Sequence, residues 1–81
     1  MRIIRTTHFE REYSKAPKQI QQAFDKQALL LLQSLRHPSL RAKKYNESTG
    51  VWQARVTRNW RFYFTIERDS YNLVDITSHP K

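Results

Sequence analysis

The second half of the chain contains three stretches in which apolar and polar side chains alternate with a period of two residues. They run from Val51 to Arg58, from Trp60 to Glu67 and from Tyr71 to Thr77. Such alternation is typical of strands in a sheet that buries one face and exposes the other to water. We therefore predict a three-stranded antiparallel meander.

The alternation assigns each side chain of the meander to one of two faces. The buried face carries bulky apolar groups: Trp52, Ala54, Val56, Phe62, Phe64 and Ile66. The wet face carries groups that bind phosphate or handle protons: Arg55, Thr57, Arg61, Tyr63, Asp75 and Thr77, with His79 two residues further on. Such a collection on an open sheet suggests a surface that binds RNA and could cleave it.

The first half of the chain predicts one short strand and two helices. The strand spans Arg2 to Thr6, and a short helix follows from His8 to Lys15, with Thr7 as its cap and Glu10 completing a capping box. Pro17 suits the first turn of a second helix, which runs to about Ser34 or Arg36. Its apolar stripe contains Ile20, Phe24, Ala28, Leu31 and Leu35, and is widened by Leu29, Leu30 and Leu32.

The stretch from Pro38 to Gly50 reads as a polar, basic connection that ends in turn-forming residues. The order of the predicted elements is therefore strand, helix, helix and three strands. We expect one α+β domain over residues 1–81, in which the helical hairpin covers one face of the sheet.

Composition restricts the chemistry. The chain has 81 residues and no cysteine, which excludes disulfides and thiolate metal sites and favours a reducing cytoplasm. The longest apolar run, Ala28 to Leu32, is far shorter than the roughly 20 residues that span a bilayer. The histidines show no metal-ligand spacing, and a single glycine excludes a glycine-rich phosphate loop. We expect no metal and no cofactor.

The net charge of +8 favours nucleic acid or an acidic protein as the partner. Positive charge is concentrated between Arg36 and Arg61, a region in which Glu47 is the single acid. Arg41, Lys43 and Lys44 form a basic cluster there that could bind phosphate backbones, or could simply be solvated. Tyr63, Tyr45 and Trp60 could stack on unpaired bases.

The alternation also predicts how the strands pair, because directly opposed residues share a face. For the first hairpin we predict a three-residue loop, Arg58 to Trp60, and three pairs: Thr57 with Arg61, Arg55 with Tyr63, and Ala54 with Phe64. For the second hairpin we predict four pairs: Phe64 with Val74, Tyr63 with Asp75, Phe62 with Ile76, and Arg61 with Thr77. This register makes Arg55, Arg61 and His79 near neighbours. The alternative is an ordinary solvated face on which Asp75 or Glu67 forms weak ion pairs.

Several motifs together resemble the RelE/ParE superfamily of toxins from bacterial type II toxin–antitoxin systems, and most closely its RelE/YafQ-like mRNA interferase branch. The resemblance covers nearly the whole chain. It includes the short first strand, the helical hairpin from Phe9 to Leu35 and the segment His37-Pro-Ser-Leu-Arg-Ala-Lys-Lys44. It continues through Trp52-Gln-Ala-Arg-Val, Asn59-Trp-Arg-Phe-Tyr-Phe and the closing Ile76-Thr-Ser-His79.

The resemblance implies a microbial-ribonuclease-like fold and metal-independent cleavage of mRNA on the ribosome, which inhibits translation. Arg61 matches the arginine that stabilises phosphorane charge, Arg55 matches a basic position on the preceding strand, and His79 resembles a C-terminal general acid. The residues implied to bind RNA or the ribosome are Arg41, Lys43, Lys44, Arg58 and Tyr63. The sequence departs from the family in having Asn59 where relatives carry an acid, and Pro80-Lys81 where many carry an aromatic residue. The general base is left open, with Asp75 and Tyr63 as candidates.

The resemblance also implies a partner, an acidic antitoxin encoded by the adjacent gene. Two other activities remain open at this stage. One is ParE-like inhibition of DNA gyrase without nuclease activity, and the other is RNA binding by a catalytically degenerate relative.

Overall fold

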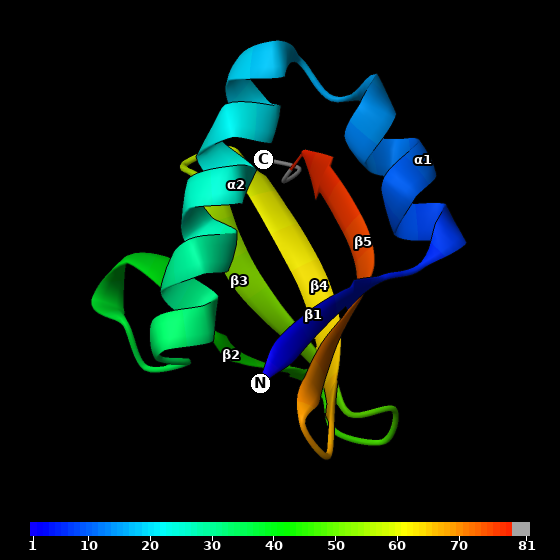
Figure 1. Ribbon diagram of the computed structural model, residues 1–81, viewed down its shortest axis with the longest axis vertical. Coiled ribbons are helices and arrows are strands. Elements are labelled where there is room, and N and C mark those ends of the chain that lie inside the picture. Colours follow the sequence, from blue (N-terminus) through cyan, green and yellow to red (C-terminus); the bar gives the residue numbers. More distant parts are fainter. Residues whose placement is uncertain (79–81) are drawn as a thin grey trace.

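The computed structural model of the chain describes residues 1–78 (Figure 1). It has an α+β fold in which two helices lie on one face of a five-stranded sheet. The strand order is β1-β5-β4-β3-β2, and every neighbouring pair is antiparallel except β1 with β5, which are parallel. The elements are β1 (Arg2–Arg5), α1 (Thr7–Lys15), α2 (Lys18–Gln33), the 3₁₀ helix η1 (Pro38–Leu40), β2 (Lys43–Asn46), β3 (Val51–Thr57), β4 (Trp60–Glu67) and β5 (Ser70–Ser78).

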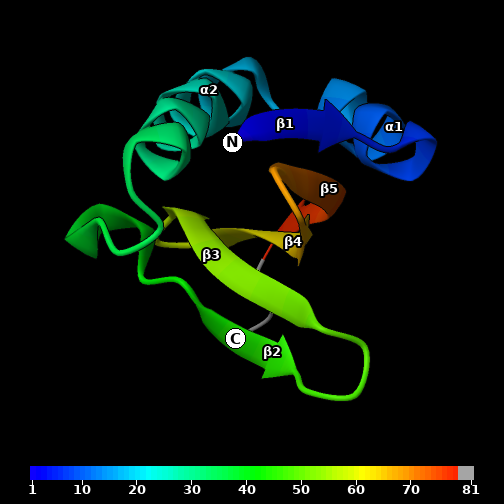
Figure 2. The ribbon, with the colours of Figure 1, turned by 60° about the horizontal axis from the view of Figure 1, so that its bottom comes forward.

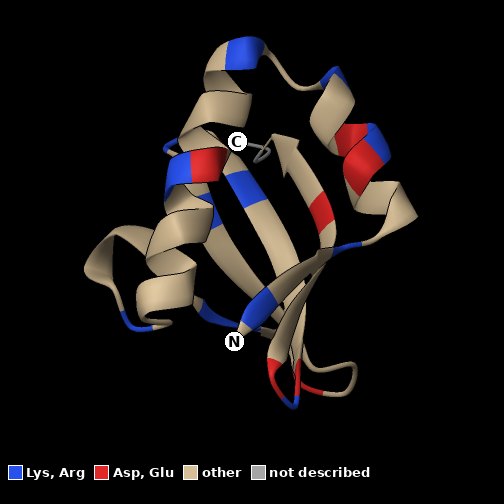
Figure 3. Cartoon of the chain, in the orientation of Figure 1, with Lys and Arg blue, Asp and Glu red and all other residues tan. Residues whose placement is uncertain are grey.

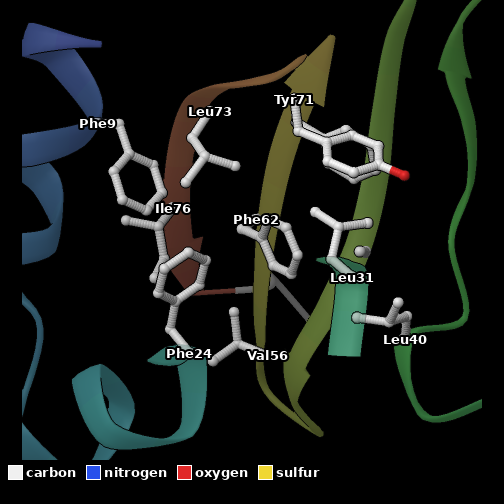
Figure 4. Close-up of a cluster of buried hydrophobic side chains, with 11 residues drawn as sticks. Phe9, Phe24, Leu31, Leu40, Val56, Phe62, Tyr71, Leu73 and Ile76 are labelled. Atoms are coloured by element: carbon white, nitrogen blue, oxygen red, sulfur yellow. The ribbon is translucent and has the colours of Figure 1, made fainter. Parts of the chain in front are cut away.

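The two helices and the inner face of the sheet enclose an aromatic core (Figure 4). Phe9 of α1, Phe24 of α2 and Phe62 of β4 are completely buried. The Phe24 ring lies 5.1 Å from the Phe9 ring and 5.1 Å from the Phe62 ring, centroid to centroid. Figure 2 shows α1 and α2 on the same side of the sheet, so that no helix covers the other face of β2, β3 and β4.

The start of α1 differs by one residue from the prediction. The cap is Thr6, whose backbone is extended and whose Oγ1 accepts a hydrogen bond of 3.1 Å from the Phe9 amide. The Thr6 hydroxyl also donates to the Leu73 carbonyl on β5, so it ties the helix to the sheet. Thr7 is the first helical residue, and the predicted capping role of Glu10 was wrong, since its carboxylate pairs with Arg5 at 3.2 Å.

Helix α2 buries a narrower stripe than we predicted. Phe24, Gln27 and Leu31 are its buried residues. Leu29 and Leu32 were expected to widen the stripe, but they are 63% and 42% exposed. They lie on the outer side of the helix, because only about a third of a helix surface can face one sheet. No helix among residues 1–78 is both long and apolar enough to cross a membrane.

The segment Pro38 to Gly50 is not the simple connection that we predicted. It contains η1 and the edge strand β2, which pairs antiparallel with β3. All four residues of β2 are exposed, so the strand shows no apolar alternation in the sequence. The lysines on it are typical of the charges with which proteins protect the open edge of a sheet.

The predicted register of the β3–β4 hairpin was wrong. Arg55 lies opposite Arg61 rather than Tyr63, and Ala54 lies opposite Phe62 rather than Phe64. The turn has two residues, Arg58 and Asn59, and the ladder shifts between Arg55 and Thr57. The bulge absorbs one residue, so a tight turn is compatible with faces that match in character.

The register of the β4–β5 hairpin is as predicted at three pairs. Phe62 lies opposite Ile76, Tyr63 opposite Asp75 and Arg61 opposite Thr77. Phe64 lies opposite Leu73 instead of Val74, since the ladder shifts between Tyr63 and Phe64. This second bulge places Leu73, which is completely buried, in the core.

Candidate anion-binding site

Two arginines face each other across the β3–β4 ladder. Arg55 and Arg61 are direct cross-strand partners, and both are partly buried. The predicted register would have set them diagonally, so the bulge brings them closer together than we expected. Like charges placed directly opposite each other destabilise a sheet. The pairing therefore indicates an anion-binding site, in which a bound anion would balance the two positive charges.

Arg61 is held in place by the turn beside it. Its Nη1 donates to three carbonyl oxygens, those of Thr57 at 2.8 Å, Arg58 at 3.0 Å and Trp60 at 3.0 Å. These bonds use one of the terminal nitrogens of the guanidinium. The remaining N–H groups make no hydrogen bond to other residues of the region 1–78, and a planar anion could accept from them.

Arg55 carries an unsatisfied donor. Its Nε is buried and has no hydrogen-bond partner within residues 1–78. Burial of the guanidinium, together with the positive charges of Arg41, Arg61 and Arg58, lowers the pKa of Arg55. A buried donor without a partner and a cation surrounded by cations are both costly in free energy. A bound oxyanion would relieve both costs at once.

A pocket of about 230 Å³ lies at these side chains, and we call it the arginine pocket. Its lining residues come from η1, β2, β3 and β4 and their connections: Arg41, Lys43, Gln53, Ala54, Arg55 and Arg61. The predicted RNA-binding residues Arg41 and Lys43 are thus brought to the predicted catalytic arginines. Four cationic side chains around one small cavity can bind a phosphate group.

The arginine pocket is positioned by Gln27, a residue that the sequence analysis missed. The Gln27 side chain is buried, and its Nε2 donates to the Arg55 carbonyl at 2.9 Å and to the Ser39 carbonyl at 3.1 Å. Ser39 returns a hydrogen bond from its hydroxyl to Gln27 Oε1 at 3.3 Å. The sequence held a signal for this role, because Gln27 is a polar residue in the apolar stripe between Phe24 and Leu31.

Lys44 is separated from Lys43 by the pleat of β2. Lys43 pairs with Gln53 on the open face, whereas Lys44 pairs with Trp52. The Lys44 ammonium lies 5.5 Å from the centroid of the Trp52 ring and 3.6 Å from the Glu47 carboxylate. The two lysines predicted to act together therefore lie on opposite faces of the strand.

The other predicted residues take different positions. Tyr63 accepts a hydrogen bond from Gln53 and packs edge-to-face against the exposed Tyr45, with ring centroids 5.0 Å apart. Trp60, which we expected to be available for stacking, packs partly buried against the core. Arg58 is exposed in the turn and contributes its charge to the surroundings of Arg55. His79 lies outside the described residues.

A second group of polar residues on the open face surrounds Asp75. One of its carboxylate oxygens, Oδ1, lies 3.2 Å from His8 Nε2 and accepts a 2.8 Å hydrogen bond from the Ile76 amide. Asp75 also lines a pocket of about 360 Å³ with Tyr45, Val51, Tyr63, Val74 and Thr77. The sequence analysis did not connect His8 with this face, because nothing in the spacing shows that α1 begins beside β5.

The charge distribution separates the surface into regions. Figure 3 shows basic residues on the strands under α2 and acidic residues mainly on α1 and in the turns at the lower end of the sheet. Four of the fifteen Lys and Arg residues line the arginine pocket, and no acid among residues 1–78 does. Within residues 1–78, no three His, Asp or Glu side chains come together in a group that could hold a metal ion.

Two helices packed on one face of a mostly antiparallel five-stranded sheet, which includes the N-terminal strand, define a RelE-like α+β fold. The structure matches toxins of the RelE/ParE family over nearly its full length at low sequence identity. At the level of sequence, no protein-family model and no curated protein matches the chain. The likeness therefore rests on three-dimensional structure.

Three solved structures illustrate the match. A YoeB/ParE toxin from Agrobacterium tumefaciens superposes with a TM-score of 0.81 at 12% identity, covering 99% of this chain and 100% of its own. YafQ from E. coli gives a TM-score of 0.78 at 15% identity, covering 94% of this chain and 90% of its own. A copper-bound mutant toxin from Helicobacter pylori gives a TM-score of 0.75 at 10% identity, covering 98% and 94%.

Proposed function

We propose that this protein is the toxin of a type II toxin–antitoxin system and acts as a ribosome-dependent, metal-independent mRNA endoribonuclease. The observation that carries the proposal is the direct opposition of Arg55 and Arg61 in a cationic pocket, with a buried Arg55 donor that has no partner within residues 1–78. The sheet gains no stability from this arrangement, whereas a bound phosphodiester would balance the opposed positive charges and accept a hydrogen bond from the unpaired donor. The RelE-like fold is the reason for placing the substrate on the ribosome.

The proposed reaction needs charge stabilisation and two proton transfers. The ribose 2′-oxygen loses its proton and attacks the adjacent phosphorus, and the bond from phosphorus to the 5′-oxygen breaks. The leaving 5′-oxygen takes up one proton, so the products are a 2′,3′-cyclic phosphate and a free 5′-hydroxyl. Negative charge on the pentacoordinate phosphorus oxygens is stabilised by the guanidinium groups of Arg55 and Arg61.

The two proton transfers need a base and an acid near the arginine pocket. Asp75 is the proposed general base, because its carboxylate is fixed by His8 and the Ile76 amide on the same face of the sheet as Arg61. His79 is the proposed general acid on the evidence of the sequence alone. The proton-transfer groups contribute typically about 10²–10⁴-fold each to rates of this kind.

The binding partners follow from the charge. Arg41, Lys43, Arg58 and Tyr63 would contact messenger or ribosomal RNA around the arginine pocket, and Lys44 would contact it from the other side of β2. An acidic antitoxin would neutralise the toxin by covering the same cationic surface. The cytoplasm is the proposed compartment, since both ribosomes and the antitoxin are found there.

Inhibition of DNA gyrase without nuclease activity is the second candidate. Two features favour it. Arg61 already donates Nη1 to three backbone carbonyls, so this side chain also has a structural role in the turn. The residue before Trp60 is Asn59, where YafQ-like nucleases carry an acid. Both features are compatible with a fold that has kept the arginines and lost catalysis.

Toe-printing of a translated mRNA in the presence of the purified protein separates the two candidates. Cuts within codons on translating ribosomes support the nuclease, and they should disappear with Arg55→Ala. Arg11→Ala is the matched control, because it removes the same charge from an exposed position on α1. Intact message combined with loss of gyrase supercoiling activity would reject the nuclease in favour of the second candidate.

A further inference from the structure

Arg41 belongs to two pockets. Besides the arginine pocket, it lines a second cavity of about 230 Å³ that we call the indole pocket. The other residues that line the indole pocket come from the connection between α2 and η1, from η1 and the segment after it, and from β3: Leu35, Arg36, His37, Pro38, Ala42 and Trp52. Figure 2 shows the segment between α2 and β2 lying beside β3, which is how these residues meet.

The backbone is strained at Arg41, the residue that lines both pockets. Arg41 has φ of 47° and ψ of 43°, the left-handed region that residues other than glycine rarely adopt. Its amide donates to the Pro38 carbonyl at 3.3 Å and closes η1. Strained residues of this kind cluster at sites of function, and here the strained residue is the one that lines both cavities.

The indole pocket has a different chemistry from the arginine pocket. Its walls include the Trp52 ring, which stacks on Phe64 at an interplanar angle of 16° and is therefore held rigidly. Leu35, Pro38 and Ala42 add apolar surface. His37 Nδ1 accepts a hydrogen bond from the Ser39 amide, so the neutral ring carries its proton on Nε2, which is available as a donor.

A nucleotide combines the two chemistries in one molecule. Its phosphate requires clustered cations, and its base requires apolar and aromatic surface with hydrogen-bond donors at the edge. We propose that the indole pocket holds the base of an unpaired ribonucleotide whose phosphate occupies the arginine pocket, with Arg41 contacting both. This inference rests on the proposed function and deepens it, because it names single-stranded RNA with one unstacked base as the bound form.

The charges around the indole pocket favour RNA over a peptide as its occupant. Arg36 and Arg41 lie at the pocket, and the Lys44 ammonium lies over the Trp52 ring at 5.5 Å. An acidic peptide would be attracted by these charges, but its carboxylates would gain nothing from the apolar surface between them. A base stacked or edge-packed near Trp52 uses both features, since each base has an apolar face and a polar edge.

The test measures binding of the whole chain to a short single-stranded oligouridine and to versions that lack one base in turn. For the wild-type protein, removal of one particular base should weaken binding roughly 5- to 100-fold. Ala42→Leu adds bulk to the pocket wall. This variant should bind the complete RNA as weakly as the wild type binds the abasic RNA, with no further loss when that base is absent.

The outcomes distinguish this inference from the proposed function. If Arg55→Ala weakens binding while the effects of Ala42→Leu and base removal simply add, the indole pocket does not hold the base, although the phosphate site stands. If Ala42→Leu weakens binding of polyglutamate but not of RNA, the pocket binds protein, and the inference is overturned. If the wild type binds no oligouridine, the inference is overturned, whereas the proposed function is decided separately by toe-printing of translated mRNA on the ribosome. Arg36→Ala, at an exposed rim position, provides a second variant should Ala42→Leu fail to fold, and it should also weaken binding of the complete RNA more than that of the abasic RNA.

Discussion

The side-chain amide of Gln27 on α2 donates a 2.9 Å hydrogen bond to the main-chain carbonyl of Arg55 on β3. This bond joins the covering helix to the strand that carries the arginine pocket. Gln27 also binds Ser39 through both its nitrogen and its oxygen, and Ser39 stands two residues before Arg41. A single buried amide therefore fixes the relative positions of two elements that line the pocket.

We expect Gln27→Ala to destabilise the protein by about 1–3 kcal/mol, because it removes a buried side chain and leaves the part-buried carbonyls of Arg55 and Ser39 without their donor. Chemical denaturation with urea measures this loss. Gln22→Ala removes an exposed glutamine from the same helix and should change stability by less than about 0.5 kcal/mol. Equal effects of the two substitutions would contradict the bridging role of Gln27.

Arg55 should be costly to stability and necessary for binding. The pKa of Arg55 is lowered, so the unfolded chain holds this proton more tightly than the folded chain does. The charged side chain therefore opposes folding at every pH below its folded pKa, including neutral pH, and the loss is regained only as the pH rises through that value. We expect Arg55→Gln to melt at the same temperature as the wild type or higher, while growth arrest is lost.

Phosphate should reverse the cost of Arg55. An anion that binds only the folded protein raises the melting temperature, and the increase grows with the logarithm of the anion concentration above its dissociation constant. Inorganic phosphate should therefore stabilise the wild type more than it stabilises Arg55→Gln, and calorimetry at constant ionic strength measures the difference. Arg11→Gln provides the charge-matched control on α1. An identical response of all three proteins would show that phosphate acts through general screening and not through the pocket.

The sequence predicted the α+β fold and the wet face, because both depend on which residues are apolar. It could not predict the β3–β4 register. Pairing faces of like character excluded a two-residue turn at Arg58 and Asn59, but a bulge between Arg55 and Thr57 makes that turn possible. A bulge leaves the alternation of each strand readable and changes only how the strands are aligned. The direct cross-strand pairing of Arg55 with Arg61 could therefore not be inferred from the alternation of the sequence.

The residues missed by sequence reasoning are those that act across elements. Edge strand β2 is polar throughout, so no hydrophobic period marks it. His8 meets Asp75 only because α1 begins beside the end of β1, which is parallel to β5. Contacts of this kind depend on how elements are packed against one another, and local patterns do not encode them.

We expect Asp75→Asn to preserve the fold and to reduce mRNA cleavage about 10²–10⁴-fold. Asparagine keeps the oxygen that accepts from the Ile76 amide but cannot take up the proton of the 2′-hydroxyl. Single-turnover cleavage on stalled ribosomes measures the rate, and antitoxin binding reports on the fold. Asp69→Asn, in the exposed turn before β5, is the control. A normal rate with Asp75→Asn would remove this carboxylate as the general base and leave the phosphate-binding role of the arginines intact.

The Tyr13 hydroxyl donates to Asp25 Oδ1 at 2.9 Å and links α1 to α2, beneath an Arg5 guanidinium 4.6 Å from the Tyr13 ring. Burial, followed by the hydrogen bond to Asp25 and its charge, raises the pKa of Tyr13 above 10.0. The folded chain therefore keeps this proton longer than the unfolded chain does. The resulting stability is fully present below pH 10.0 and declines as the pH rises through the folded pKa.

Tyr13→Phe keeps the ring that stacks on Phe9 but should be less stable near neutral pH and lose less stability in alkali. Urea denaturation across that range measures the difference, with the exposed Tyr45→Phe as the control. Parallel curves for Tyr13→Phe and wild type would show that the helices are held together by ring packing alone.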